Sequence, residues 1–176
     1  MPHFFRAMSL PVLLGIALAP AAALAQGNTH LNIAAGMSLP TGDFGDAHSV
    51  GYNVIGGIGS QSRTSALGFR IEGLFTEFEQ EGTDRKSRVI GATANALYNL
   101  TAQNRSSANS LYIIGGVGYY NTRLVPFTSS QSNIGMNVGG GFQFPLTGFS
   151  AYIEARYHAI SDQGVRFVPI SFGLVF

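Results

Sequence analysis

The sequence predicts an all-β protein, specifically an eight-stranded antiparallel up-and-down transmembrane β-barrel. Three observations predict it: apolar residues alternate with small or polar ones, glycine contributes 23 of the 176 residues, and charged residues contribute only 11%. A soluble helical domain would need charged outer faces, but the chain has a single lysine, Lys86. Disordered chains are poor in aromatic residues, whereas this one has 13 phenylalanines and 7 tyrosines.

Residues 1–25 are predicted to form a signal peptide that is cleaved on export, which leaves residues 26–176 as the barrel domain. A basic residue, Arg6, precedes an apolar run from Leu10 to Leu18 that is too short to cross a bilayer. A small-x-small pattern then marks the cleavage site, which consists of Ala23, Ala25 and the following Gln26.

Period-two alternation, the pattern of a strand with two unlike faces, begins after residue 28. In the first such segment Leu31, Ile33 and Met37 share one face, and Asn32 and Ser38 share the other. The same alternation predicts strands at 31–39, 67–76, 90–100, 134–144, 151–159 and 168–176.

Two further segments, 50–60 and 110–121, are glycine-rich and apolar on both phases, so we expect strands there whose facing stays open. Each strand has about ten residues, the length that crosses a bilayer when tilted. No linker or second domain is visible. Turn-forming residues separate the segments, in the stretches 40–43, 61–65, 79–87, 102–109, 126–133, 145–148 and 161–164.

The contents of the two faces decide between a soluble and a membrane form. The polar face holds mainly Gly, Ser, Thr, Asn and Ala, which is too little charge for a solvated exterior but suits the interior of a narrow barrel. The apolar face has no charge at the centre of any strand, which suits contact with lipid. An exported soluble β-protein, such as a lipocalin-like binder, is the alternative.

Aromatic residues near the strand ends are candidates for the belts that contact the membrane interfaces. They are Phe44, Tyr52, Phe75, Phe78, Tyr98, Tyr119, Tyr120, Phe142, Phe144, Phe149, Tyr157, Phe172 and Phe176.

Four charged residues share the inward phase of the third and seventh strands: Arg70, Glu72, Glu154 and Arg156. Their signs balance, as expected for ions inside a narrow lumen, because an unpaired buried charge is very costly. A charge-neutral plug that locks the lumen is the preferred interpretation, and a gate or selectivity element in a pore is the alternative.

Other candidate sites are weaker. His158, Ser161 and Asp162 form the only compact group that resembles a hydrolase constellation. His30, His48 and His158 are far apart in sequence for a metal site, and Asp43 and Asp46 are candidates only for weak calcium binding. A mixed charge run within residues 79–88 is typical of a solvated loop: Glu79, Glu81, Asp84, Arg85, Lys86 and Arg88.

Composition narrows the function classes further. There are no cysteines, which excludes disulfides and thiolate metal sites. The net charge of +1 offers no basic surplus for nucleic acid. We expect no cofactor and no catalytic or metal-binding residues.

The chain resembles the eight-stranded outer-membrane barrels of Gram-negative bacteria, the group that includes the OmpA membrane domain, OmpX and the opacity-type surface proteins. Three short segments carry the resemblance together with the C-terminal strand: Pro40–Phe44, Asn95–Asn99 and Glu154–Tyr157. In that strand Phe172, Leu174 and the terminal Phe176 are similar to the signal read by the outer-membrane assembly machinery. The peptidoglycan-binding domain of the OmpA pattern is not expected.

The resemblance implies both termini in the periplasm, outer loops at 40–50, 77–88, 122–133 and 161–165, and periplasmic turns at 61–66, 101–109 and 145–149. It implies an integral outer-membrane protein whose partners are outer-membrane lipid, lipopolysaccharide and the barrel-assembly machinery. The charge run 79–88 then lies in the second outer loop, where it could meet lipopolysaccharide phosphates or a host partner. A non-enzymatic surface or structural role (envelope integrity, adhesion or host contact) is the first hypothesis. A narrow, low-conductance pore is the second, and a lipid-modifying enzyme the third.

The cleavage site predicts the mature N-terminus. Sequencing the N-terminus of the protein isolated from membranes is expected to begin at Gln26, because signal peptidase requires small residues before the cut. Replacing Ala25 by Asp should leave the signal attached. An N-terminus at Met1 in the wild-type protein would contradict the prediction.

Overall fold

The computed structural model describes residues 28–61, 65–101, 109–125, 130–161 and 164–176. The predicted signal peptide and its cleavage site lie outside these residues. None of the helices in the described ranges is long and apolar enough to span a membrane.

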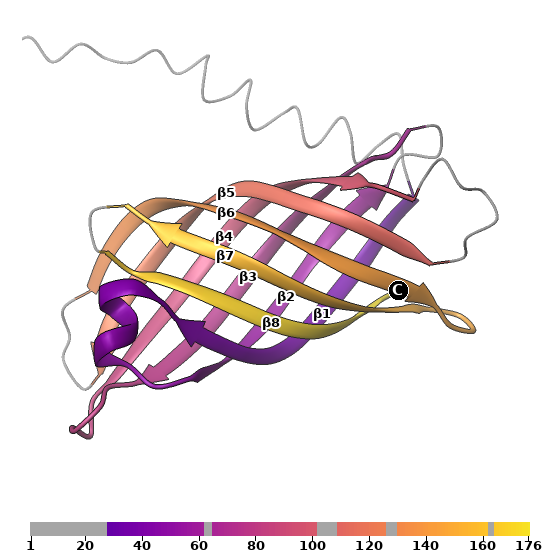
Figure 1. The fold of residues 1–176 in the computed structure, drawn as a ribbon. Coiled ribbons are helices and arrows are strands. Elements are labelled where there is room, and N and C mark those ends of the chain that lie inside the picture. Colours follow the sequence, from indigo (N-terminus) through magenta and orange to yellow (C-terminus); the bar gives the residue numbers. More distant parts are fainter. Residues whose placement is uncertain (1–27, 62–64, 102–108, 126–129, 162–163) are drawn as a thin grey trace, which may run out of the picture.

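The described chain forms one closed barrel in which every strand pairs antiparallel with the next and β1 pairs with β8 (Figure 1). The up-and-down barrel predicted from the sequence is therefore confirmed. Its elements are β1 (Asn28–Pro40), the 3₁₀ helix η1 (Gly42–Ala47), β2 (Gly51–Gln61), β3 (Leu67–Glu79), β4 (Lys86–Asn99), β5 (Ser110–Val125), β6 (Ser130–Pro145), β7 (Ser150–Ile160) and β8 (Arg166–Val175).

Several strands are longer than the alternation predicts. β3 runs to Glu79 and β4 starts at Lys86, so the expected loop 77–88 shrinks to a hairpin turn over 80–85. β5 and β6 likewise extend into the expected loop 122–133. Backbone pairing continues beyond the apolar belt because the ladder joins backbone N–H and C=O groups and does not depend on apolar side chains.

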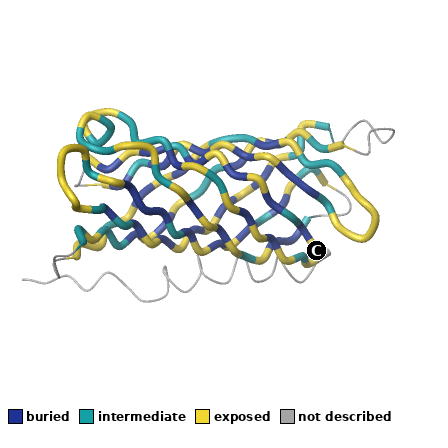
Figure 2. The backbone as a smooth tube through the Cα atoms, turned by 90° about the horizontal axis from the view of Figure 1, so that it is seen from below, coloured by how far each residue is buried: buried dark blue, intermediate teal, exposed yellow. Residues whose placement is uncertain are grey.

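The alternation correctly predicts which side chains face outward. Buried and exposed residues alternate along each strand (Figure 2), and the exposed phase is the apolar one, as on Ile134, Met136 and Val138 of β6. The structure also settles the two open strands. Val54 of β2 and Val117 of β5 are exposed on the outer wall, and their buried neighbours point inward.

Three of the aromatic residues expected at the membrane interfaces lie elsewhere. Phe78 and Tyr120 are fully buried inside the barrel, and Phe44 of η1 packs against the same internal cluster. Phe78 contacts Phe44 and Phe167 edge-on, with ring centroids 5.2 and 5.6 Å apart respectively. These rings close the lumen at the η1 end.

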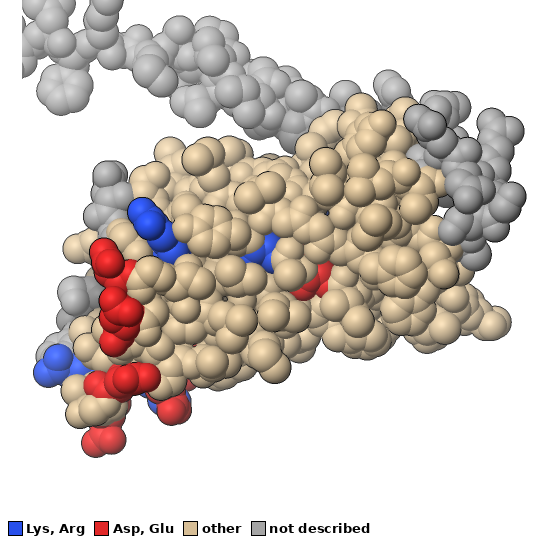
Figure 3. All heavy atoms as spheres, viewed as in Figure 1, with Lys and Arg blue, Asp and Glu red and all other residues tan. Residues whose placement is uncertain are grey.

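The two ends of the barrel differ in charge. Most acidic and basic side chains gather at the end that carries η1 and the β3–β4 hairpin (Figure 3). The remaining described charges lie at mid-height inside the barrel, where they are buried. The η1 end therefore suits an aqueous or headgroup environment, and the middle of the outer wall suits lipid.

The internal aromatic cluster predicts unequal costs for two Phe→Ala changes. Phe78→Ala is expected to lower the free energy of unfolding by about 3–5 kcal/mol, because it opens a cavity among buried rings. Phe142→Ala, on the exposed outer wall, is expected to cost less. Urea unfolding of the vesicle-inserted barrel, followed by gel mobility without boiling, measures both; equal losses would contradict the packing described.

Candidate functional site

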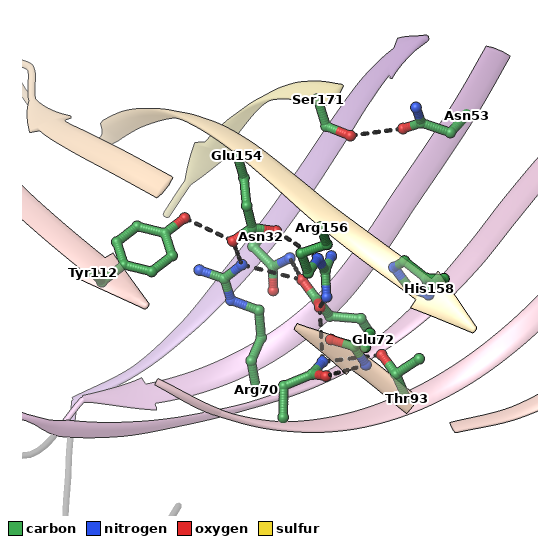
Figure 4. A network of polar contacts seen from close by, with 12 residues as sticks. Asn32, Asn53, Arg70, Glu72, Thr93, Tyr112, Glu154, Arg156, His158 and Ser171 are labelled. Atoms are coloured by element: carbon green, nitrogen blue, oxygen red, sulfur yellow. Dashed lines mark hydrogen bonds and ion pairs between the residues drawn. The ribbon is translucent and has the colours of Figure 1, made fainter. Parts of the chain in front are cut away.

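The four charged residues predicted to share the lumen meet across it. Arg70 and Glu72 lie on β3, and Glu154 and Arg156 on β7, which stands on the opposite side of the ring of strands. The inward phase of both strands turns all four side chains into the barrel, where each is at most 3% exposed. Figure 4 shows the resulting network.

Two ion pairs cross the lumen, and two others each join residues of a single strand, one on β3 and one on β7. Arg70 Nη1 lies 2.9 Å from Glu154 Oε2, and Arg156 Nη1 lies 2.7 Å from Glu72 Oε2. Within β7, Arg156 Nε lies 2.8 Å from Glu154 Oε1, and within β3, Arg70 Nη1 lies 3.3 Å from Glu72 Oε1. The four charges therefore form a closed, electrically neutral square.

Neutral polar side chains complete the hydrogen bonds of the two carboxylates. Asn32 Nδ2 and Asn95 Nδ2 donate to Glu72 at 2.8 and 3.0 Å, and the Tyr112 hydroxyl donates to Glu154 at 2.7 Å. Asn137 then donates to Asn95 at 2.9 Å. The network thus ties β1, β4, β5 and β6 to the charged pairs on β3 and β7.

These neutral partners were not predicted from the sequence. Asn32 and Asn95 sit on the inward phase of predicted strands, so alternation could have placed them in the lumen. Tyr112 lies in a segment whose facing was open. Which inward residues meet depends on the stagger of the strands around the barrel.

Glycines make room for the long charged side chains. Gly57 faces Glu72 across the β2–β3 ladder, and Gly139 faces Arg156 across the β6–β7 ladder. A Cβ atom at Gly57 would lie 2.7 Å from Glu72 Cγ, and one at Gly139 would lie 2.7 Å from Arg156 Cγ. Glycine at these two positions therefore leaves the space that the Glu72 and Arg156 side chains occupy.

The sequence of residues 11–176 matches the family model described as the outer membrane protein beta-barrel domain. This chain belongs to that family. Membership implies the bacterial outer membrane as its location. A comparison with curated proteins finds no match.

Solved barrels share the fold at low identity. Neisserial surface protein A is 19% identical, with a TM-score of 0.64, and covers 84% of this chain and 95% of its own. Ail, the attachment invasion locus protein of Yersinia pestis, is 17% identical, with a TM-score of 0.55, and covers 86% and 99%. The outer membrane enzyme PagL is 15% identical, with a TM-score of 0.51, and covers 84% and 98%. At these identities the likeness shows the fold alone.

The candidate hydrolase group is not assembled among the described residues of this barrel. His158 is buried in the lumen, where its Nδ1 lies 2.9 Å from the Tyr120 hydroxyl and its ring stacks on Phe167 at 5.0 Å. Ser161 is exposed in the turn after β7, and Asp162 lies outside the described residues. His158 is thus a core residue of the aromatic cluster, away from the lipid-facing wall.

The candidate metal ligands also remain apart. In the described ranges no group of three or more metal-binding side chains comes together. His48 instead joins η1 to the barrel, with Nε2 2.7 Å from Ser87 Oγ and Nδ1 2.9 Å from the Phe44 carbonyl oxygen. Asp43 lies in the first turn of η1.

The residues of the expected assembly signal lie on the outward phase of β8 and at Phe176, which follows it. Phe172 and the terminal Phe176 are more than half exposed there. Phe176 also closes the barrel seam through reciprocal backbone hydrogen bonds with Leu31, at 2.9 and 3.0 Å. Recognition of this strand by the assembly machinery stays a prediction.

The neutral square predicts a large cost for removing one charge. Glu72→Gln is expected to lower the free energy of unfolding by about 3–5 kcal/mol, because it leaves a buried arginine uncompensated. Glu79→Gln is the matched control, since the Glu79 side chain is 72% exposed. Urea unfolding in vesicles compares them; equal small effects would show that the square is not buried in the folded protein.

Proposed function

We propose that the protein is a non-enzymatic structural and surface protein of the Gram-negative outer membrane, in which a sealed barrel presents its η1 end outward. The observation that carries the proposal is the closed, electrically neutral set of ion pairs across the lumen. The network joins six strands across the interior, so the barrel can serve as a rigid support. Its function then lies with its rim and outer wall. We further propose that β8, with Phe172, Leu174 and Phe176, is the strand that the assembly machinery reads.

The rim at the η1 end supports a surface role. The connection between β1 and β2 folds against the β3–β4 hairpin through a bridge between His48 and Gln80. Two backbone hydrogen bonds extend this contact, from Ser49 N to Glu79 O at 2.9 Å and from Glu81 N to Ala47 O at 3.0 Å. A hydrogen-bonded rim holds its side chains in a fixed arrangement, which favours contact with an external partner.

A narrow pore is the second candidate, favoured by one observation. In the described part of the chain, several buried lumen atoms have no hydrogen-bond partner: Asn32 Oδ1, Arg70 Nε, Asn137 Oδ1 and Tyr152 OH. Buried polar atoms of this kind are commonly served by internal water. Water in the lumen would give ions a route only if the crossed ion pairs separated.

Planar-bilayer recording tests the sealed barrel. The wild-type protein is expected to give no sustained channels, because separating two buried ion pairs costs several kcal/mol. The double variant Glu72→Ala/Arg156→Ala removes one cross-lumen pair without changing net charge, and it is expected to conduct. Sustained wild-type channels would overturn the proposal in favour of the pore.

A lipid assay tests the non-enzymatic part. Wild-type protein incubated with lipopolysaccharide is expected to release no fatty acid. Release that is lost in His158→Ala, while that variant keeps the heat-dependent gel shift of a folded barrel, would establish an enzyme instead.

A further inference from the structure

A row of charged residues crosses the outer wall just above the apolar belt at the η1 end. Glu77 of β3 pairs in register with Arg88 of β4, and Arg88 pairs in register with Arg123 of β5. All three share the phase of outward residues such as Ile90 and Tyr119, which are 53% and 58% exposed. The row therefore lies on the outside of the barrel.

The carboxylate in this row is already occupied. Glu77 accepts hydrogen bonds from Arg88 Nη2 and Nε at 2.7 and 3.0 Å and from Lys86 Nζ at 3.2 Å. Lys86 Nζ also lies 3.6 Å from Glu79. Two carboxylates of β3 thus neutralise two cations of β4.

Arg123 is the excess charge. It stands directly opposite Arg88, and like charges directly opposite on one face of a sheet destabilise the pairing. Within the described ranges, no carboxylate forms an ion pair with Arg123. Arg123 thus has no counter-charge of its own in this row, and an anion bound beside it would relieve the like-charge contact with Arg88.

The wall below Arg123 changes from polar to apolar in two steps. The next outward residue of β5 is Asn121, whose Nδ2 donates to Ser132 Oγ of β6 at 2.8 Å in an exposed position. Beneath this pair lies a groove of about 430 Å³. Its wall is formed by Ile71, Ala92, Ala94, Val117, Tyr119 and Ile134.

The groove lies at the right distance from the charges for an amphiphile. Ala92 is four residues along β4 from Arg88, which corresponds to roughly 13 Å of strand. Ala92 and Ala94 keep the floor of the groove low, while Ile134 at 66% exposure forms a raised edge. A molecule with an anionic head, sugar hydroxyls and acyl chains would meet matching groups in that order.

We infer that this wall is a binding site for a phosphorylated glycolipid of the lipopolysaccharide class, with its phosphate between Arg88 and Arg123 and an acyl chain over Ala92 and Ala94. The Asn121–Ser132 pair faces the sugar, which favours a glycolipid over a glycerophospholipid. The inference rests on the proposed placement of the η1 end at the outer leaflet.

Binding to purified barrel in detergent tests the site. Native mass spectrometry with diphosphoryl lipid A is expected to show a bound lipid, and Arg123→Gln should weaken its affinity about tenfold through loss of a charge-assisted contact. Arg166→Gln is the matched control. Arg166 is an exposed arginine at the same end, on β8, and its register partner is Ala159. Ala94→Phe should weaken binding by filling the groove.

A second measurement compares the thermal stability of Arg123→Gln and wild type, first without lipid and then with lipid A. Without lipid, the variant is expected to lose its compact gel form at a higher temperature than wild type, because the like-charge pair is relieved. With lipid A, it should gain less stability than wild type.

Four outcomes would overturn the site. Equal lipid A binding by Arg123→Gln and Arg166→Gln would exclude the phosphate contact at Arg123. Unchanged binding by Ala94→Phe would exclude the groove as the site of the acyl chain. Equal binding of phosphatidylglycerol would exclude selectivity for a glycolipid. Full competition by inorganic phosphate would show that only the phosphate group is bound. Each leaves the bilayer recordings of the sealed lumen unaffected, so this inference and the proposed function fail separately.

Discussion

Backbone hydrogen bonding is the constraint on which the rest of this structure depends. In lipid an unpaired N–H or C=O group costs several kcal/mol, so a sheet that crosses a membrane must close on itself. Here the closing seam joins β1 to β8, and the last residue, Phe176, exchanges hydrogen bonds with Leu31. Closure with eight strands leaves a lumen only wide enough for side chains, and the contents of that lumen follow from its width.

A narrow lumen imposes its own chemistry on the inward phase. Arginine and glutamate side chains at mid-height are shielded from bulk water, so each must find opposite charge and hydrogen bonds inside the barrel. Glu72 meets two arginines and two asparagine amides, and Gly57 leaves the space that its side chain crosses. Charge balance, amide placement and glycine placement are thus three consequences of one restricted volume.

The outer wall is subject to different constraints because it contacts lipid, whereas the lumen is filled by side chains. Apolar residues suffice over most of its height, and a charge there is tolerated only near the headgroups. The excess Arg123 beside Arg88 lies above the apolar belt, next to the charges of the β3–β4 hairpin. The interior is therefore neutralised by the protein itself, whereas this part of the exterior leaves one charge for a component of the membrane.

The sequence by itself determined the fold class, the facing of six strands and the four charges of the lumen, because a strand repeats every two residues and its pattern is local. It left β2 and β5 open, since glycine carries no side chain to mark a face. Its assignment of Phe78 and Tyr120 to the membrane interfaces was wrong, because sequence shows aromatic character but not how far a strand continues or which face a Gly-rich strand turns inward.

Only the tertiary structure decided which residues meet. Tyr112 reaches Glu154, and Arg88 stands opposite Arg123, because of the stagger between strands. That stagger is a property of the closed ring, in which every ladder must agree with all the others before the last strand meets the first. No single segment of sequence contains it.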